Sequence, residues 1–436
     1  MLSFYSSFIK NNLLSKKPIS LWQATAIGLG NIIGAGIFVL AGTVINQAGP
    51  GAVLSFLLTA ILAVTVALNS AELASKIVSH GGLYSFAKET MGEAMGFVVG
   101  WLRAISYAIA TSAVSLGFSS YLLTMIDLYS IHLEIAVAIG LMSFAVFLNY
   151  VGIKVVAEIE ELLVGLTTGG LVIFIIISFI YGKWVPSRFT PLVPHGPFSI
   201  IQSASLAFFA YSGFNTVATL TPEIVEGRKN APKAIILSLG ISTILYLLVV
   251  IGMLALMPWK LYSVTADPLL NALNFARAPP FVDQIIGAVA VVATVTVTLS
   301  LIVAGSRTLL QMSDDGLLPK TLGKKDSPRR AIILIGIIAI FSVFLGNVQY
   351  IALASNFGVI FSYAITGLAV YIVRKRNVEG PFNSPFYPYV QIISVILSVV
   401  VMLALGDQAL YIGSVTIIAG FFLYVLEKEE RTHLKK

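Results

Sequence analysis

Two apolar stretches of this chain carry glycine at positions where backbone atoms could bind a ligand. The first, GLGNIIGAGIF (residues 28–38), contains four glycines, and Gly34 and Gly36 fall near the middle of an apolar segment long enough to cross a membrane. The second, FFAYSGFNTVATLTPE (residues 208–223), has Gly213 at mid-segment. Because glycine costs a helix about 1 kcal/mol relative to alanine, both stretches predict an interrupted helix.

An interrupted helix at membrane depth presents backbone groups that can bind the charged ends of a ligand. A helix that restarts at the first break offers unpaired N–H groups and the positive end of its dipole, which suit a carboxylate. At the second break, carbonyl groups lose their helical donors and can accept from an ammonium group. The N–H groups are those of Gly34, Ala35, Gly36 and Ile37, and the carbonyls are those of Phe208, Phe209, Ala210 and Ser212. Together the two breaks fit a zwitterion, which predicts an α-amino acid as the ligand.

Close helix packing is the alternative interpretation of these glycines. Gly28 and Gly30 fit packing or flexure as well as they fit a site, whereas Gly34 and Gly36 are the positions we expect to contact the ligand. Interruptions in two corresponding segments favour a transporter site built from internal repeats.

A row of hydroxyl groups in the stretch ATVTVTLS (residues 293–300) could bind a coupling cation. Thr294 and Thr298 share one helix face, and their oxygens together with carbonyls near Gly30 and Ile33 would suit Na⁺. The alternative is that these hydroxyls bond back to carbonyls of their own helix. The sequence leaves Na⁺ coupling, H⁺ coupling and exchange open, and it indicates no other metal or cofactor.

Other polar residues in the apolar segments are few. Glu72 and Lys76 lie four apart and predict a local ion pair or an inner gate, and Arg103 is expected at the inner end of its helix. We find no acidic residue placed to hold a cationic side chain in the first, third, sixth or eighth segment, which favours a neutral substrate. The chain has no cysteine, and its four histidines fall in loops or tails, so neither a histidine relay nor a cysteine nucleophile is expected.

Composition places the chain in a membrane. Of its 436 residues, 57% are hydrophobic and 11% are charged, whereas a soluble globule carries about 25% charged residues. The net charge of +7 lies mostly between the apolar runs, so it indicates topology and not nucleic-acid binding. Windows of about 20 apolar residues predict twelve spanning helices. The expected spans are 21–45, 50–78, 94–126, 132–152, 161–182, 199–222, 233–257, 281–312, 330–346, 349–373, 386–406 and 408–427.

The distribution of lysine and arginine predicts that both termini lie in the cytoplasm. Of the 27 such residues, 21 fall in the tails and loops that this orientation places inside and four in outer loops, with Arg103 and Arg307 within helices. The breaks in segments one and six divide ten helices into two sets of five, and an odd number of helices gives the second set the opposite orientation. This is the layout of a LeuT-type core. The predicted units are a tail at 1–20, repeats at 21–182 and 199–373, two further helices at 386–427 and a tail at 428–436.

Five stretches of the first ten helices, taken in order, carry a resemblance to a known family: GLGNIIGAGIF, AELASKIVSHGGLYSF, GFVVGW, FFAYSGFNTVATLTPEIVEGRKNAPKAI and SRTLLQMSDDGLLP. Through them the chain resembles the amino acid, polyamine and organocation (APC) family of permeases. This resemblance implies that the amides of residues 33–37, from Ile33 to Ile37, bind the substrate carboxylate and that the backbone of residues 208–212 binds the amine, with Phe209 or Tyr211 as an aromatic gate. The chain departs from the family pattern at two places. It has Asn215 where many members of the family carry an acidic residue, and it has Thr167 and Thr168 where some members carry a lysine.

These observations predict an integral cytoplasmic-membrane protein that moves amino acids, with a neutral substrate favoured, by alternating access. A transporter of cationic amino acids or polyamines with the same fold is the alternative, and a passive channel is the rival of another class. An enzyme is not expected, because no intramembrane acid pair or serine–base pair is present. The expected partners are the amino acid substrate and membrane lipid, with no nucleic acid, and the oligomeric state is left open.

Overall fold

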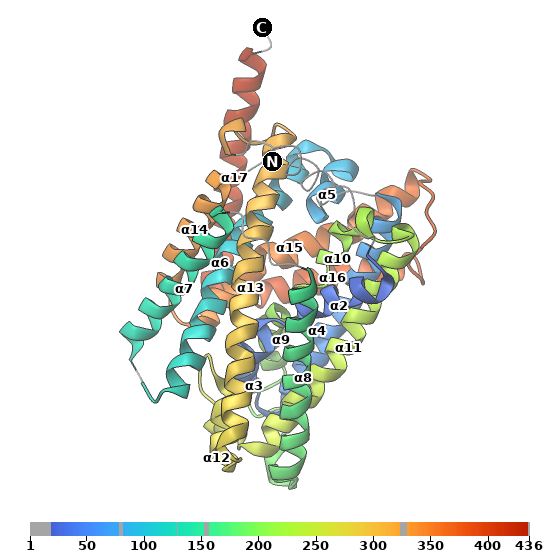
Figure 1. The fold of residues 1–436 in the computed structure, drawn as a ribbon. Coiled ribbons are helices and arrows are strands. Elements are labelled where there is room, and N and C mark those ends of the chain that lie inside the picture. Colours follow the sequence, from blue (N-terminus) through green and yellow to red (C-terminus); the bar gives the residue numbers. More distant parts are fainter. Residues whose placement is uncertain (1–18, 78–81, 129, 152–156, 323–328, 435–436) are drawn as a thin grey trace, which may run out of the picture.

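The computed structural model describes residues 19–77, 82–128, 130–151, 157–322 and 329–434, and this part of the chain is dominated by helices (Figure 1). Its α-helices are α2 (Leu21–Ile32), α3 (Ala35–Ala48), α4 (Ala52–Lys76), α5 (Leu83–Met91), α6 (Glu93–Met125), α7 (Ile131–Val151), α8 (Ala157–Tyr181), α9 (Phe198–Tyr211), α10 (Thr216–Thr219), α11 (Gly227–Leu256), α12 (Pro268–Ala276), α13 (Pro280–Asp314), α14 (Arg329–Ser342), α15 (Val348–Lys375), α16 (Tyr389–Leu403) and α17 (Asp407–Leu434). Within the described ranges no strand forms, and Ile19 and Ile224 make one isolated bridge.

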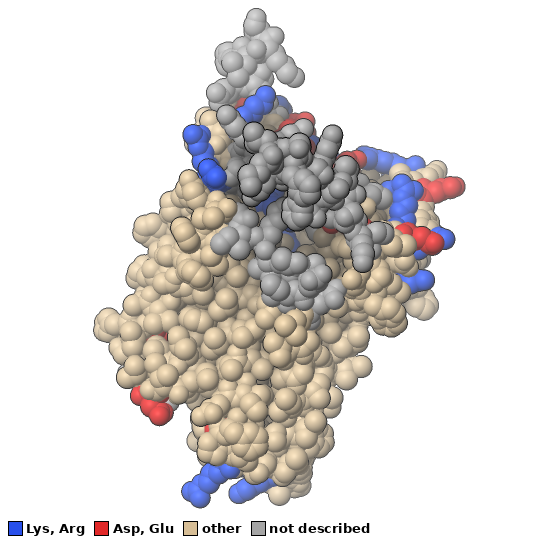
Figure 2. Space-filling model, in the orientation of Figure 1, with Lys and Arg blue, Asp and Glu red and all other residues tan. Residues whose placement is uncertain are grey.

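The surface of the molecule is that of a membrane protein. Lys, Arg, Asp and Glu side chains gather at the two ends of the face in Figure 2, and the surface between them consists almost entirely of other residue types. Large apolar side chains are exposed along the outer helices, among them Phe144, Phe147, Ile176, Phe179, Ile244, Phe341 and Phe422. Exposed apolar surface of this extent, between two charged ends, is typical of a protein that lies in a lipid bilayer. The chain is therefore a polytopic, all-α membrane protein.

Eight of the described helical segments are long and apolar enough to cross a membrane, whereas the sequence predicts twelve spans. Each predicted span contains a helix, but several are short. The first and sixth are divided by breaks, and α14 and α16 have 14 and 15 residues, fewer than the roughly 20 that a straight crossing needs. The difference in number comes from the broken sixth span, from the two short helices, and from the first two spans, because α3 and α4 run together as one apolar segment, Ala35–Lys76.

The two broken segments pack against each other inside the bundle. Helix α3 contacts α9, and α4 contacts both. Helices α13 and α15 each pack against α6 beside this pair, and α11 packs along α2 and α4. Helix α17 projects from one end of the bundle, and α12 lies at the other (Figure 1). The interrupted helices are therefore enclosed by continuous ones, which is the setting in which unwound backbone is tolerated at membrane depth.

Candidate functional site

The first break lies between α2 and α3, where the sequence predicts it. Ile33 ends α2 and Gly34 precedes α3 in an extended conformation, with φ −93° and ψ −152°. Gly34 makes no side-chain cap, and the first N–H groups of any α-helix have no partner within the helix. The N–H groups of Ala35, Gly36 and Ile37 are the first three of α3, and all three residues are buried. A buried, uncapped helix start is suited to an anion.

The second break separates α9 from the four-residue helix α10. Its turn lies directly against the first break: a Cβ on Gly213 would overlap the carbonyl group of Asn31 and lie 2.8 Å from the Ile32 amide nitrogen. Similarly, a Cβ on Gly36 would lie 2.9 Å from the Cβ of Ala210 in α9. Glycine is required at both positions because two backbones meet there, so the packing interpretation of these glycines holds together with the predicted breaks.

Tyrosine hydroxyls from neighbouring helices contact the carbonyls that the breaks release. The Tyr246 hydroxyl, on α11, lies 2.6 Å from the Ile32 carbonyl oxygen and 3.0 Å from that of Ala210. The Tyr363 hydroxyl, on α15, donates to the Ser212 carbonyl oxygen at 2.9 Å. In this conformation two of the carbonyls predicted to receive an ammonium group are thus in contact with tyrosine. Sequence reasoning missed both tyrosines, and their only signal is a hydroxyl inside an apolar helix.

A small cavity opens beside the second break. Its volume is about 20 Å³, and its lining residues are Arg103, Ser106, Tyr107, Ala110, Phe209, Ser212, Leu301, Ser355, Asn356 and Val359. They come from α6, α9 and its C-terminal turn, α13 and α15. Of the predicted ligand-binding residues, Phe209 and Ser212 line this cavity, whereas those of residues 33–37 do not. Because one water needs about 10–15 Å³, the cavity admits a water molecule and must widen to admit an amino acid.

Arg103 lines this cavity, in the first third of a helix at whose inner end the sequence leads us to expect it. It is ten residues into α6, about 15 Å from the helix start, and it is 7% exposed. Its Nη2 donates to the Tyr107 hydroxyl, and its guanidinium lies 4.6 Å from the centre of the Tyr107 ring and 5.9 Å from that of Tyr363. Its Nη1 is buried and has no hydrogen-bond partner among the described residues. Sequence reasoning missed this position because helix phase and depth cannot be read from hydropathy.

Comparison with known proteins identifies the fold family. Residues 19–425 match the family described as amino acid permeases. The chain belongs to this family. This confirms the resemblance drawn from the glycine-rich motifs, and it makes the protein a transporter of amino acids and not an enzyme.

Several relatives align with the permease over nearly its whole length. It is 32% identical to the methylthioribose transporter of Bacillus subtilis (strain 168), over 96% of this chain and 95% of that protein. It is 30% identical to the branched-chain amino acid permease BcaP of the same organism, over 97% and 95% of the two chains. It is also 30% identical to BcaP of Lactococcus lactis, over 92% of each chain.

The residues predicted for a coupling ion are divided between different contacts in the permease. The Thr294 hydroxyl donates within its own helix, with the Ala290 and Val291 carbonyl oxygens at 2.8 and 2.9 Å. The Thr298 hydroxyl lies 3.4 Å from that of Ser115 on α6. A Cβ on Gly30 would meet the Val164 side chain of α8, so this glycine serves close packing. In this conformation the Thr294 hydroxyl therefore bonds to carbonyls of its own helix, whereas the Thr298 hydroxyl faces another helix.

Gly34 connects the first break to the same region of α13. A Cβ on Gly34 would lie 2.7 Å from the side chain of Val297, the residue next to Thr298. Across the part of the chain that the structure describes, no group of three or more His, Cys, Asp or Glu side chains could hold a metal ion.

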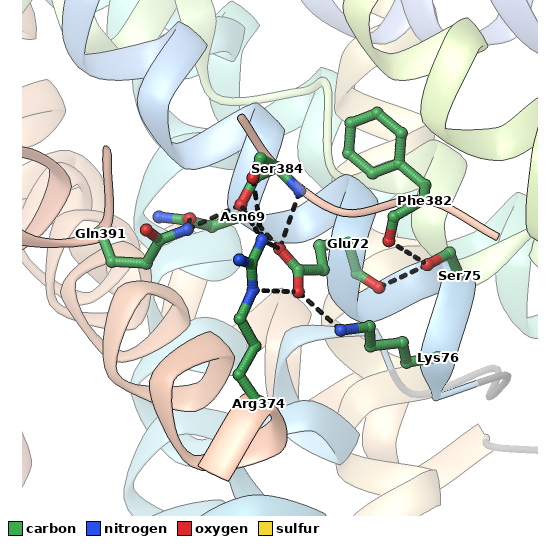
Figure 3. Close-up of polar contacts among 8 residues, drawn as sticks. All are labelled: Asn69, Glu72, Ser75, Lys76, Arg374, Phe382, Ser384 and Gln391. Carbon is green, nitrogen blue, oxygen red and sulfur yellow. Dashed lines mark hydrogen bonds and ion pairs between the residues drawn. The ribbon is translucent and has the colours of Figure 1, made fainter. Parts of the chain in front are cut away.

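The ion pair predicted between Glu72 and Lys76 is present at 2.7 Å and belongs to a larger network (Figure 3). Arg374 of α15 binds both Glu72 carboxylate oxygens, at 2.8 Å each. The backbone and the hydroxyl of Ser384 donate to Glu72 at 2.9 and 2.6 Å. Gln391 of α16 extends the network by donating to the Ser384 hydroxyl. Glu72 thus ties α4 to α15 and to the segment before α16, which sequence spacing could not show for partners about 300 residues away.

Proposed function

We propose that this permease carries neutral amino acids across the cytoplasmic membrane by alternating access, with the substrate held between the two helix breaks. The observation that carries the proposal is the cavity at the second break: two predicted ligand-binding residues line it, and its one charged lining residue is the cation Arg103. A cationic side chain placed there would be repelled by a buried like charge. The similarity to branched-chain amino acid permeases favours the same class of substrate.

The uncapped start of α3 remains our proposed site for the substrate carboxylate, and the turn after α9 our proposed site for the amine. The proposed residues are Ile33, Gly34, Ala35, Gly36 and Ile37 on one side and Phe208, Phe209, Ala210, Tyr211 and Ser212 on the other. Since the cavity is too small for an amino acid, alternating access in this scheme begins with movement of the broken segments away from α6 and α15. The Tyr246 and Tyr363 hydroxyls would then exchange carbonyl partners as the substrate enters.

The proposed architecture is a LeuT-type core of ten helices in two inverted sets of five, followed by two helices, with both termini in the cytoplasm. It is supported by the positions of the two breaks, in the first and sixth predicted spans, and by their mutual contact. It is also supported by the excess of lysine and arginine in the loops assigned to the inside.

Transport in this proposal is driven by an ion gradient or by exchange. Thr298 with carbonyls near Ile33 would provide oxygen ligands of the kind that Na⁺ takes, and protons or exchange are the alternatives that the test separates. Purified permease in liposomes should take up a labelled neutral amino acid saturably, and unlabelled neutral amino acids should compete better than lysine or arginine. Flux that never saturates would contradict the proposal and favour a channel.

The same liposomes test the coupling and the position of the site. A fall in uptake on Na⁺ removal would support the Thr298 site, whereas indifference to Na⁺ with a response to a pH gradient would assign coupling to protons. Gly36→Val should abolish uptake while the protein still inserts, because the side chain would enter the contact with Ala210 at the proposed carboxylate site. Gly240→Val is the matched control, since a Cβ at Gly240 meets nothing within 4 Å. Normal affinity in Gly36→Val would refute the site.

A further inference from the structure

We propose that Arg103 binds a carboxylate of the transported substrate, so that the cavity selects ligands carrying this group. The inference rests on the proposed function and assigns a recognition role to a side chain outside both helix breaks. It revises one part of that proposal: either Arg103 binds the α-carboxylate in place of the α3 amides, or the substrate is an acidic amino acid and not a neutral one.

Burial without a counter-ion is the first observation behind this assignment. Arg103 is 93% buried in a helix that crosses the membrane, where ionisable side chains are rare and usually functional. Within the described ranges, no Asp or Glu oxygen lies within 4.0 Å of its guanidinium. Taking a charge out of water without a partner costs several kcal/mol, so the permease keeps this arginine at a cost to its stability.

The unpaired Nη1 is the second observation, and it is independent of the charge. The guanidinium donates through Nη2 to the Tyr107 hydroxyl and lies over the Tyr107 and Tyr363 rings, but Nη1 has no hydrogen-bond partner within the described ranges. These contacts hold the guanidinium in place, and the Nη1 edge, which is buried in this conformation, stays unpaired until the cavity widens for a ligand. Such an edge matches a carboxylate, which guanidinium binds through charge-assisted and often paired hydrogen bonds.

The rest of the cavity wall supports an anionic ligand group and offers no competing acid. Ser106, Ser212 and Asn356 supply polar atoms, and the other lining residues are apolar, aromatic or hydroxyl-bearing. The amides of α3 do not line the cavity. A ligand lodged beside the second break therefore meets the positive charge of Arg103 before any other charge.

The carboxylate could be the α-carboxylate that all amino acids share or one on the side chain of an acidic amino acid. Both have the same chemistry, and ligand analogues separate them. If Arg103 binds the α-carboxylate, leucine should bind and leucinamide, which lacks this group, should not. If it binds a side-chain carboxylate, glutamate should bind more tightly than glutamine and leucine, and Arg103→Gln should weaken glutamate alone.

The test measures competition by leucine, leucinamide, glutamate, glutamine and lysine against a transported labelled amino acid, in wild type, Arg103→Gln, Arg103→Lys and Arg307→Gln. Loss of a charge-assisted hydrogen bond predicts about a 10- to 100-fold weaker affinity for the carboxylate ligand in Arg103→Gln. Arg103→Lys should bind the carboxylate ligand more tightly than Arg103→Gln and less tightly than wild type, because lysine keeps the positive charge but lacks the paired N–H donors of the guanidinium. Arg307→Gln is the matched control, because it also removes an arginine from a membrane helix, but Arg307 is exposed on α13. This variant should bind all five ligands with wild-type affinity.

The outcomes separate this inference from the proposed function. Wild type that transports leucine, with Arg103→Gln of unchanged affinity for all five ligands, overturns the carboxylate role of Arg103 and leaves the proposed function intact. Wild type that transports no amino acid overturns both. Should Arg103→Gln fail to insert, ligand-induced thermal stabilisation of purified Arg103→Lys decides: leucine or glutamate must stabilise it less than wild type, and equal stabilisation overturns the inference.

Discussion

Gly213→Ala should separate the two helix breaks by steric overlap alone. The added Cβ would overlap the Asn31 carbonyl and lie 2.8 Å from the Ile32 nitrogen, whereas relaxed heavy-atom contacts lie at about 3.5–4.0 Å. The two backbones would therefore have to move apart by roughly 0.7 Å or more at that nitrogen. The obstacle is backbone on both sides, so no side-chain rotation relieves it.

The expected cost is about 1–3 kcal/mol of stability, as for overpacked sites in general. It should appear as a lower thermal unfolding midpoint in detergent and as lower uptake in liposomes. Gly240→Ala on α11 is the control, because its Cβ meets nothing within 4 Å and alanine is the better helix former by about 1 kcal/mol. Its midpoint should stay the same or rise.

Equal midpoints and equal uptake for Gly213→Ala and wild type would refute the close approach of the two breaks. A lower midpoint in both alanine variants would refute the steric reasoning, since only one of them meets a neighbour. A fall confined to Gly213→Ala would support the view that the breaks are mutually fitted.

Three further predictions concern contacts around the breaks and at the helix ends. Glu72→Gln should lower stability by about 3–5 kcal/mol, because it leaves the buried Lys76 and the partly buried Arg374 without their carboxylate; an unchanged unfolding midpoint would contradict this. Tyr246→Phe should cost about 1–3 kcal/mol and reduce uptake, since the freed carbonyls lose a donor, and wild-type behaviour in both assays would count against it. In the turn after α13, burial raises the pKa of Asp315, but hydrogen bonds from Lys88 at 2.7 Å and from the Tyr84 hydroxyl outweigh the effect of burial and hold the pKa below its usual 3.8. The ionised form therefore stabilises the fold above about pH 4, and this contribution is lost as pH falls below that value, so Asp315→Asn should show a shallower loss of thermal stability in acid.

Local rules explain the parts of the site that sequence reasoning predicted. Gly34 and Gly213 mark breaks because glycine weakens a helix wherever it occurs, and this effect depends on no distant partner. Glu72 and Lys76 pair because residues four apart share a helix face. The apolar spans follow from the length needed to cross lipid. Only eight full-length segments result from twelve predicted spans, because the sixth span is broken, α14 and α16 are short, and α3 and α4 run together as one segment.

The remaining contacts join residues far apart in the chain, and no periodicity indicates them. Hydropathy shows neither the rotation nor the depth of a helix, so it could not place Arg103 in a cavity, which forms where α15 packs against α6 and α9. Tyr246 meets two carbonyls released by different breaks, and Arg374 meets Glu72 across 302 positions. The sequence by itself determined that this protein is a membrane transporter with two interrupted helices, because composition and glycine placement act locally. The tertiary structure decided which side chains surround the breaks, because that depends on how separate helices pack.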